Sequence, residues 1–317
     1  MMYRGQFAQL MVPGLHHMFV HWLDVTQRES EYDKIFNLET SEDAFEDEAE
    51  FSGLGPLNQK PEGTAVLYDD AVQGGTKRYL HLPWALGVRT SFELFRDDKY
   101  GLIKQVPKAL ARSAQFTREQ QAANVFNLGF TNAITTTDGV SLFNTQHPLL
   151  GGPQATAIGP GVSSIIASAG TFPNRPLVDS DLSVSALQQC MDQFERLIDS
   201  QGLPVVLKPK TVFIPPALRW IAREILGSPN VPYSAENQIN SLIPEELSYA
   251  IGHYLTSDSA WFVLCDKESH QLKYFDRDPL DEDFADDFDT KTLKEMCYMR
   301  FSVGATSWMG VWGSNGA

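Results

Sequence analysis

The sequence predicts an α+β fold with mixed sheets, and three observations lead to that prediction. Segments with helical periodicity and β-prone segments alternate along the 317 residues without regular strand–helix–strand repetition. Hydrophobic residues make up 43% of the chain, which is enough to build a sizeable core. The chain shows no internal repeat, so each element is taken in its own right.

Residues 97–130 are predicted to be helical in two pieces. Pro107 marks a kink or a first-turn position in the first piece, and the second opens at the capping-box spacing of Thr117–Gln120. Three basic residues recur at every fourth position along one side: Lys104, Lys108 and Arg112. Side chains four apart share a helix face, so they form a basic ridge, which is either a solvated face or a surface that meets a partner.

Further elements follow toward the C-terminus. An amphipathic helix carries its apolar face over residues 184–198, and Gly202 is placed to end it. Residues 205–215 are typical of a strand, and residues 215–227 begin with proline and end with glycine as a helix does. Residues 299–313 supply two closing strands.

Two hairpins are predicted. Residues 64–92 contain two β-prone runs around the glycine turn Val72–Gly75. Both faces of these runs are mixed in polarity, and an isolated hairpin is marginally stable in water. This hairpin therefore rests either on its own domain or on another subunit. The second hairpin joins residues 261–265 to residues 272–277.

Composition excludes several classes of protein. The formal net charge is −15, which disfavours a general nucleic-acid-binding surface. No apolar run approaches the length of a membrane span, and the N-terminal stretch lacks the pattern of a secretion signal. The three cysteines are widely spaced, so three free, buried thiols are expected in place of a zinc site or disulfides: Cys190, Cys265 and Cys297. The acidic stretch at residues 39–50 is either a solvated linker or an arm that docks on a basic surface.

Known catalytic motifs are absent. The chain contains no GxSxG, GxxxxGK[ST] or GxGxxG sequence. His16, His17 and His21 could share a helix face as metal ligands, but the HExxH glutamate is missing and an amphipathic helix explains them as well. The acidic run at residues 281–291 lacks the glycine and the closing glutamate of a calcium loop, which favours a solvated loop.

One loop-like stretch, TTTDGVSLFNTQHPLLGG at residues 135–152, presents a single histidine, His147. A general base needs a nucleophile within reach, and no serine or cysteine nearby has an activating context. The default interpretation is a structural one, in which His147 packs against or caps a turn.

The order of segments resembles the major capsid proteins of tailed bacteriophages, in particular the Mu-like major head subunit branch. The segments that carry the resemblance span nearly the whole chain: TAVLYDDAVQGGTKRYLHLPWALGV, DDKYGLIKQVPKALARSA, AANVFNLGF, DGVSLFNTQHPLLGG, PKTVFIPPALRWIAREILGSP and MRFSVGATSWMGVWGS. The resemblance implies the Hong Kong ninety-seven capsid fold. It divides the chain into an N-terminal arm (1–52), an extended hairpin loop (53–92), a peripheral domain with a long spine helix (93–165), an axial domain (166–280) and a return to the peripheral domain (281–317).

The resemblance implies a structural protein of the virion that does no catalysis and needs no cofactor or metal. It would assemble in the host bacterial cytoplasm into hexamers and pentamers, which form an icosahedral shell around double-stranded DNA contacted weakly and without sequence specificity. Scaffold, portal and decoration proteins would be its partners, and membranes would not. Contacts between subunits are expected at Gly74, Gly75, Arg78 and Trp84, and the ridge of Lys104, Lys108 and Arg112 would face the lumen or receive an arm.

Two alternatives remain open from the sequence. An encapsulin-like shell has the same fold but encloses a protein cargo. A metal-dependent hydrolase would use the histidines at residues 16–21 together with the acidic residues near 281–289.

Overall fold

The computed structural model describes most of the chain. The described residues are 8–28, 30–51, 53–54, 57, 59–66, 68, 70, 73–91, 93–94, 97, 101, 105–148, 171–199, 203–232, 238–287, 289–290 and 292–317. They divide into two compact units. The first unit comprises Met1–Glu46, Tyr79–Ala122 and Tyr274–Val303, and the second comprises Asp47–Arg78, Ala123–Lys273 and Gly304–Ala317.

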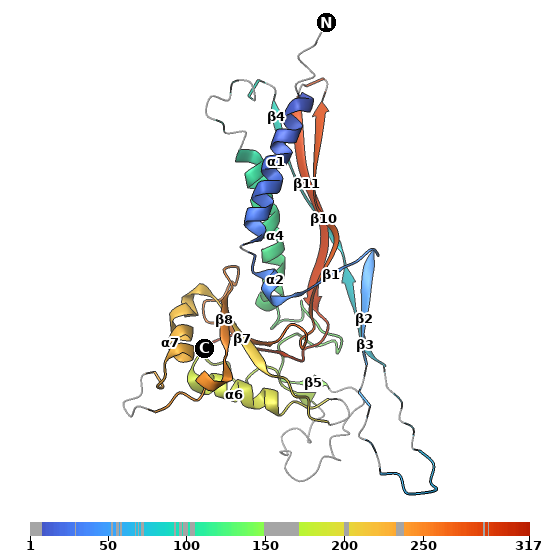
Figure 1. Cartoon of the computed structure of the whole chain (residues 1–317), viewed down its shortest axis with the longest axis vertical. Helices are drawn as coiled ribbons and strands as arrows, with labels where there is room; N and C mark the ends of the chain where they lie inside the picture. The colour runs from blue at the N-terminus through green and yellow to red at the C-terminus, as the bar shows by residue number, and fades with distance from the viewer. Residues whose placement is uncertain are drawn as a thin grey trace. The chain divides into compact units, whose positions relative to one another are not determined.

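The first unit is built on a four-stranded sheet in the order β1-β10-β11-β4. Its strands are β1 (Asn37–Thr40), β4 (Leu82–Ser91), β10 (Leu272–Asp287) and β11 (Thr292–Ala305). Strands β11 and β4 run antiparallel, with Thr292 opposite Ser91 and Phe301 opposite Leu82. The long strands β10 and β11 follow one another in the chain and pair side by side at the centre of the sheet (Figure 1).

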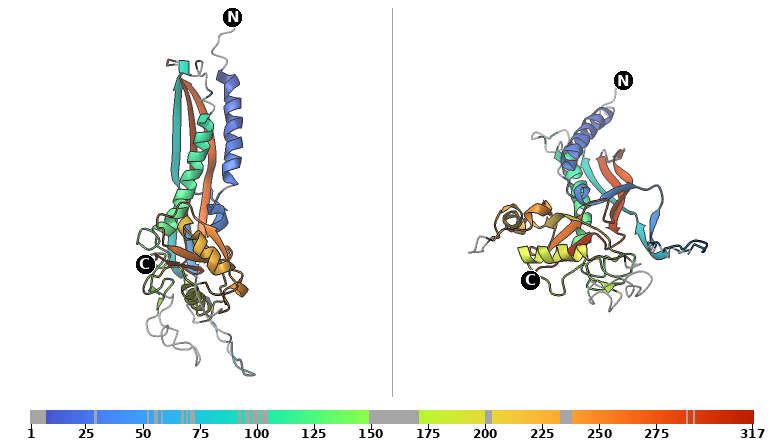
Figure 2. Two further views of the ribbon diagram at one scale, coloured as in Figure 1. Left: turned by 90° about the vertical axis from the view of Figure 1, so that its left-hand side faces the viewer. Right: turned by 60° about the horizontal axis from the view of Figure 1, so that its bottom comes forward.

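Three helices accompany this sheet: α1 (Ala8–Gln27), α2 (Tyr32–Ile35) and α4 (Val106–Asn127). Phe19 of α1, Leu110 of α4 and Cys297 of β11 belong to one buried apolar cluster. Helices α1 and α4 therefore pack together against the sheet, and both views show them side by side (Figures 1 and 2).

The second unit contains the four-stranded sheet β12-β9-β7-β8. Its elements are α6 (Val184–Glu195), β7 (Pro209–Ile214), η4 (Pro216–Leu218), α7 (Arg219–Gly227), η5 (Ile243–Glu245), β8 (Ser248–Ile251), β9 (Trp261–Cys265) and β12 (Val311–Ser314). Strand β7 pairs parallel with β8 and antiparallel with β9. Apolar residues of α6 and α7, such as Leu187 and Ile225, pack on Trp261 and Val263 of β9.

An aromatic cluster stands on alternate residues of the same sheet. Phe126 lies 4.9 Å from Phe213 and 5.0 Å from Phe262, measured between ring centroids. Phe143 lies 5.1 Å from Phe262. Successive side chains of a strand point to opposite faces, so Phe213 and Phe262 face this cluster while Val212 and Val263 face the helices.

Two pairs of strands complete the described fold. Strand β2 (Phe45–Phe51) pairs with β3 (Gln73–Leu80), and β5 (His147–Pro148) pairs with β6 (Thr171–Phe172). The pair of β2 and β3 is called the β2–β3 ribbon below. His81 alone separates β3 from β4 in the chain.

The predicted glycine turn at Val72–Gly75 is wrong. Gly74 and Gly75 lie inside β3, and neither is among the described glycines with positive φ. The strand partner of β3 is β2, so the paired segments begin earlier in the chain than expected. Glycine pairs at turns and glycines at close backbone approaches look alike in a sequence, and Gly75 belongs to the second kind, as shown below.

Three further sequence predictions are corrected. Helix α4 is continuous, because Thr117 lies within it and its hydroxyl donates to the Ser113 carbonyl, 2.9 Å away, instead of capping a new helix. Strands β9 and β10 belong to different sheets and form no hairpin. Acidic residues of the run at 281–291 lie in β10, where pairing on both sides outweighs a loop-like composition.

Other predictions are confirmed. The described chain mixes helices with sheets that contain parallel and antiparallel pairs. Pro107 occupies the first turn of α4, where its missing N–H is tolerated. All three cysteines are free and buried. Among the described helices, none has the length and apolar character to cross a membrane.

Candidate assembly surfaces

The β2–β3 ribbon carries two of the residues expected at subunit contacts, Gly75 and Arg78. A Cβ atom on Gly75 would lie 1.7 Å from the carbonyl oxygen of Thr137, far inside van der Waals contact. Only glycine lets the ribbon approach this backbone, so Gly75 has a role within its own subunit. Gly74 precedes it in β3 and is half-buried.

The segment at residues 135–137 holds the ribbon at three points. The Lys77 ammonium donates to the Thr135 carbonyl at 2.7 Å, and burial lowers the Lys77 pKa. The Thr137 hydroxyl donates to Glu50 of β2 at 2.6 Å. With the approach at Gly75, these contacts fasten both strands of the ribbon to the threonine-rich turn. The sequence gave no periodic signal that would have identified Thr135 and Thr137 as anchors.

Arg78 lies exposed on β3 and forms a double hydrogen bond with Asp47 of β2. Its Nε lies 2.7 Å from one carboxylate oxygen and a terminal nitrogen lies 2.6 Å from the other. The hydrogen bond from Arg78 holds the pKa of Asp47 below its ordinary value. Arg78 is therefore paired across the ribbon and remains accessible on its surface.

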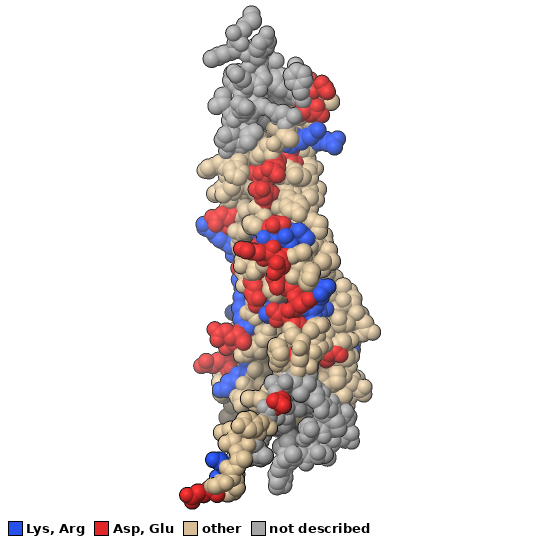
Figure 3. Space-filling view, turned by 90° about the vertical axis from the view of Figure 1, so that its right-hand side faces the viewer, with Lys and Arg blue, Asp and Glu red and all other residues tan. Residues whose placement is uncertain are grey.

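Acidic residues at 39–50, which the sequence left as either a linker or an arm, form strands with basic partners in their own chain. Asp47 pairs with Arg78, and Glu48 lies 2.6 Å from the Lys273 ammonium. Figure 3 shows groups of Asp and Glu side chains on one face, with Lys and Arg side chains beside them. Part of the negative charge of this stretch is thus neutralised within the subunit.

Trp84 lies on β4 in the first unit. Its ring stacks on Phe301, with centroids 5.9 Å apart and planes inclined by 22°. Together with Ser113 and Thr117 of α4 it lines a cavity of about 60 Å³. Trp84 is half-buried, so one part of the ring contacts the sheet and the rest is accessible.

The basic ridge is only partly described. The Lys108 ammonium lies 3.8 Å from the centre of the Trp22 ring of α1, which is a cation–π contact within the subunit. Arg112 lies exposed on the next turn of α4. Lys104 lies outside the described residues.

His147 is fully buried in a hydrogen-bonded network. Its Nδ1 lies 2.6 Å from an Asp138 carboxylate oxygen and its Nε2 lies 3.1 Å from the Asn174 side-chain oxygen. The Asn174 amide nitrogen donates to the carbonyls of Leu142 and Val311, which fixes the amide orientation. Both ring nitrogens of His147 therefore donate hydrogen bonds to oxygen.

This network is structural. Burial alone would raise the pKa of Asp138, but hydrogen bonds from His147, Thr136 and Val140 outweigh it and the pKa is lowered. The His147 ring also stacks on Trp308, with centroids 4.6 Å apart. A histidine with both nitrogens engaged and both faces packed has no atom available for a substrate, in agreement with the structural interpretation of the loop.

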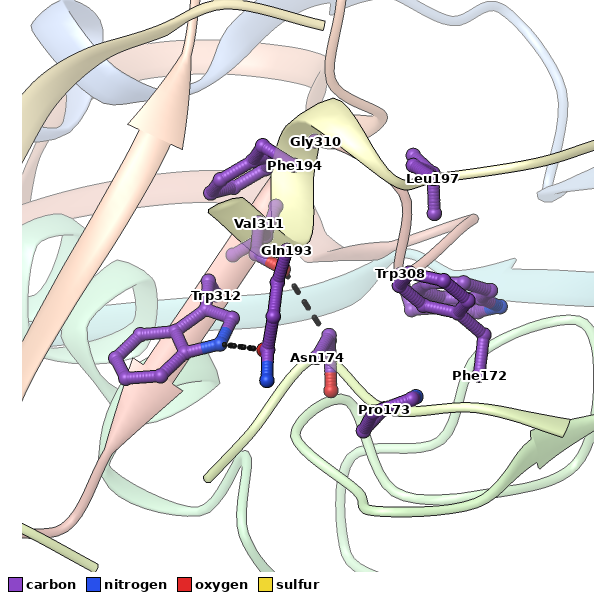
Figure 4. A pocket seen from close by; sticks show the side chains of 10 residues that line it. All are labelled: Phe172, Pro173, Asn174, Gln193, Phe194, Leu197, Trp308, Gly310, Val311 and Trp312. Atoms are coloured by element: carbon purple, nitrogen blue, oxygen red, sulfur yellow. Dashed lines mark hydrogen bonds between the residues drawn. The ribbon is translucent and has the colours of Figure 1, made fainter. Parts of the chain in front are cut away.

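The neighbouring pocket is too small for a ligand. Asn174, Gln193 and Trp312 are among its lining residues, and the Trp312 indole N–H donates to Gln193 at 2.8 Å (Figure 4). Its volume is about 10 Å³. That is the space of a single water molecule.

The metal hypothesis finds little support. His16 lies 2.8 Å from Glu282 of β10, so the structure does bring one N-terminal histidine to the acidic run. Among the described residues, however, no three His, Cys, Asp or Glu side chains are grouped so that they could hold a metal ion.

Comparison with known families follows from this arrangement of ribbon, long helix and sheets. The model of a family described as "Phage capsid protein" matches residues 76–313, which is most of the chain. The chain belongs to the phage capsid protein family. It is a structural subunit of a capsid shell that assembles with copies of itself, and its place is in the virion.

Solved structures agree at the level of the fold. The chain is similar to the capsid structure of the cyanophage P-SCSP1u, with a TM-score of 0.57 and 11% identity over 91% of this chain and 88% of that chain. For the bacteriophage JBD30 capsid the TM-score is 0.54, with 15% identity over 72% and 91%. For Mycobacterium phage Adephagia it is 0.52, with 12% identity over 89% and 88%.

These low identities show the fold and no more, and the capsid fold expected from the sequence is confirmed. A comparison with curated protein sequences gives no match.

Proposed function

We propose that this subunit forms hexamers and pentamers that close an icosahedral shell around double-stranded phage DNA, and that it catalyses no reaction. The match of residues 76–313 to the phage capsid protein family carries this proposal. In a closed shell each subunit repeats the same contacts, so weak pairwise contacts add up to a stable particle.

The division of the chain into capsid regions is part of the proposal. The regions are an arm (1–52), an extended loop (53–92), a peripheral domain (93–165 and 281–317) and an axial domain (166–280). The unbroken 22-residue helix α4 supports its assignment as the spine helix. The pairing of β2 with β3 supports a ribbon that starts within the arm and returns through the loop.

Subunit contacts are assigned to accessible residues of the ribbon and of β4. Arg78 lies exposed on the ribbon, and Trp84 lies beside the exposed apolar side chains of Leu82 and Leu86. Gly74 and Gly75 act here by setting the position of the ribbon. Lys104, Lys108 and Arg112 face the lumen or an arm of a neighbouring subunit, and the exposure of Arg112 supports this.

The DNA is held by confinement with few direct contacts. A net charge of −15 disfavours dense phosphate binding, which grows with the number of basic contacts. Assembly takes place in the host cytoplasm, with a scaffold protein, a portal and decoration proteins as further partners. The subunit needs no metal or cofactor.

The test is electron microscopy and analytical ultracentrifugation of particles from cells that express the chain with its neighbouring phage genes. We expect closed shells, and DNA that resists nuclease until the shells are opened. Shells filled with a protein cargo and free of DNA would favour an encapsulin-like function. A chain that stays monomeric under these conditions would contradict the proposal.

A further inference from the structure

Two buried glutamates face each other between the central strands of the first unit. Glu282 stands on β10 and Glu295 on the adjacent strand β11. Glu282 is 8% exposed and Glu295 is 6% exposed. Burial of two carboxyl groups at one place is unusual, because each ionised group loses its hydration.

Helix α1 closes over this pair. His16 Nδ1 lies 2.8 Å from one oxygen of Glu282, and the Glu282 side chain is fully buried beneath it. The other oxygen of Glu282 and one oxygen of Glu295 have no hydrogen-bond partner among the described residues. His16 itself is more than half exposed, so it forms the outer edge of the group.

The two carboxyl groups are close enough to share a hydrogen bond, which requires a proton on one of them. Burial, together with the hydrogen bond and the charge of Glu282, raises the pKa of Glu295 to about 8. Burial also raises the pKa of Glu282, although hydrogen bonds from His16 and Glu295 oppose that rise. Glu295 is therefore the partner that keeps the proton at neutral pH.

The surroundings supply no other base or cation that would replace this proton. From β10 the pair is faced by Asp281, from β11 by Cys297 and from α1 by His16. The residues of α4 and β4 that pack around Cys297 are apolar, including Leu110, Ala111 and Val88. When the proton leaves, two negative charges remain in an apolar site with one histidine at its edge.

We propose that His16, Glu282 and Glu295 form a proton-dependent latch that fastens α1 to β10 and β11 at acidic and neutral pH and releases the helix in alkaline solution. Lifting α1 exposes both carboxyl groups to water, where two charges are tolerated. The latch concerns the single subunit and does not depend on assembly.

The direction follows from linkage. With α1 docked, the pKa of Glu295 is about 8, against an ordinary value of 4.5 when the helix is lifted. The docked state therefore binds the proton more tightly, so docking is strongest below the ordinary value and weakens as pH rises. The opening equilibrium should increase by nearly tenfold per pH unit up to about pH 8 and then level off.

Hydrogen–deuterium exchange of the α1 amides tests the latch in the full-length chain. Glu295→Gln keeps the shape and a donor but cannot ionise. At each pH between 6 and 9, the exchange rate of the wild type is divided by that of the variant, which cancels the intrinsic effect of pH on exchange. We expect this ratio to rise by up to about tenfold per unit to pH 8 and to stay level above it.

Matched variants separate the latch from general effects. Glu268→Gln, on the exposed turn between β9 and β10, should leave the wild-type pH profile unchanged. His16→Ala should raise α1 exchange at pH 6 by about fivefold, whereas His17→Ala, exposed on the same helix, should not. A wild-type to Glu295→Gln ratio that does not change with pH would overturn the proposal. If Glu295→Gln does not fold, Glu295→Met provides the same non-ionising comparison.

Discussion

Gly75 is the residue at which the β2–β3 ribbon comes closest to the Thr135–Thr137 turn. The 1.7 Å separation between its hypothetical Cβ and the Thr137 carbonyl oxygen excludes every other residue type without a backbone shift. Lys77 and Glu50 then hydrogen-bond to the same turn from the two strands. The glycine permits the contact, and the polar pairs fix its register.

Gly75→Ala should destabilise the second unit by about 1–3 kcal/mol, because the new methyl group forces the ribbon away from Thr137. Urea unfolding monitored by circular dichroism measures the loss. Gly227→Ala is the matched control, since a Cβ there would meet no atom within 4 Å. Equal stability of the two variants would contradict the close-approach role.

His147 shows how burial changes the meaning of a residue. In the sequence it stands alone in a polar, glycine-rich stretch, which is also where catalytic histidines occur. In the structure Asp138 and Asn174 occupy its two nitrogens and Trp308 covers its ring. Its role in joining the loop to β12 depends on residues from three distant parts of the chain.

At the scale of elements, Glu119 ties α4 to the segment that contains α2. Its two carboxylate oxygens accept hydrogen bonds from the backbone N–H groups of Glu31 and Tyr32, at 2.8 and 3.1 Å. The side chain of Gln115 donates to it as well. Helix α2 has only four residues, so this capping from outside compensates for its low intrinsic stability.

Glu119→Ala should leave two buried N–H groups without a partner, at a cost of about 2 kcal/mol. Hydrogen exchange at Glu31 and Tyr32 should accelerate accordingly. Glu119→Gln retains one acceptor and should show a smaller effect, while Gln120→Ala on the exposed face of α4 serves as the control. Unchanged protection in Glu119→Ala would show that α2 is held by its apolar contacts alone.

At the scale of the whole molecule, the charge of −15 is arranged so that some acidic residues meet basic ones of the same chain. Exposed ion pairs of this kind contribute little to folding because solvent screens them. They do decide which charges remain on the surface for a neighbouring subunit. Arg78 is the residue at which these two roles can be separated.

Arg78→Asp should reduce the yield of closed particles by at least about tenfold, since a contact worth ~1.4 kcal/mol is repeated throughout the shell. The double variant Asp47→Arg with Arg78→Asp restores the pair within the ribbon. We expect it to fold normally and to remain defective in assembly.

Lys208→Asp, an exposed site in the same unit, matches the charge change of Arg78→Asp and should assemble normally. Electron microscopy counts the particles, and circular dichroism confirms the fold of each variant. Full recovery of particles in the double variant would show that Arg78 acts only within its own subunit.

The sequence alone determined the class of fold, several elements and the family. Apolar periodicity located α6, the proline and glycine at the ends of residues 215–227 located α7, and the order of segments indicated a phage capsid protein. These features are local or follow the order of the chain. Spacing and composition are sufficient to reveal them.

Tertiary structure decided which strands pair and which polar residues meet. Strands β9 and β10 look like a hairpin in the sequence but enter different sheets, and Gly74–Gly75 looks like a turn but lies within a strand. The contact of His16 with Glu282 joins positions 266 residues apart. Pairing and burial of this kind depend on the free energy of the whole unit, so no local stretch of sequence specifies them.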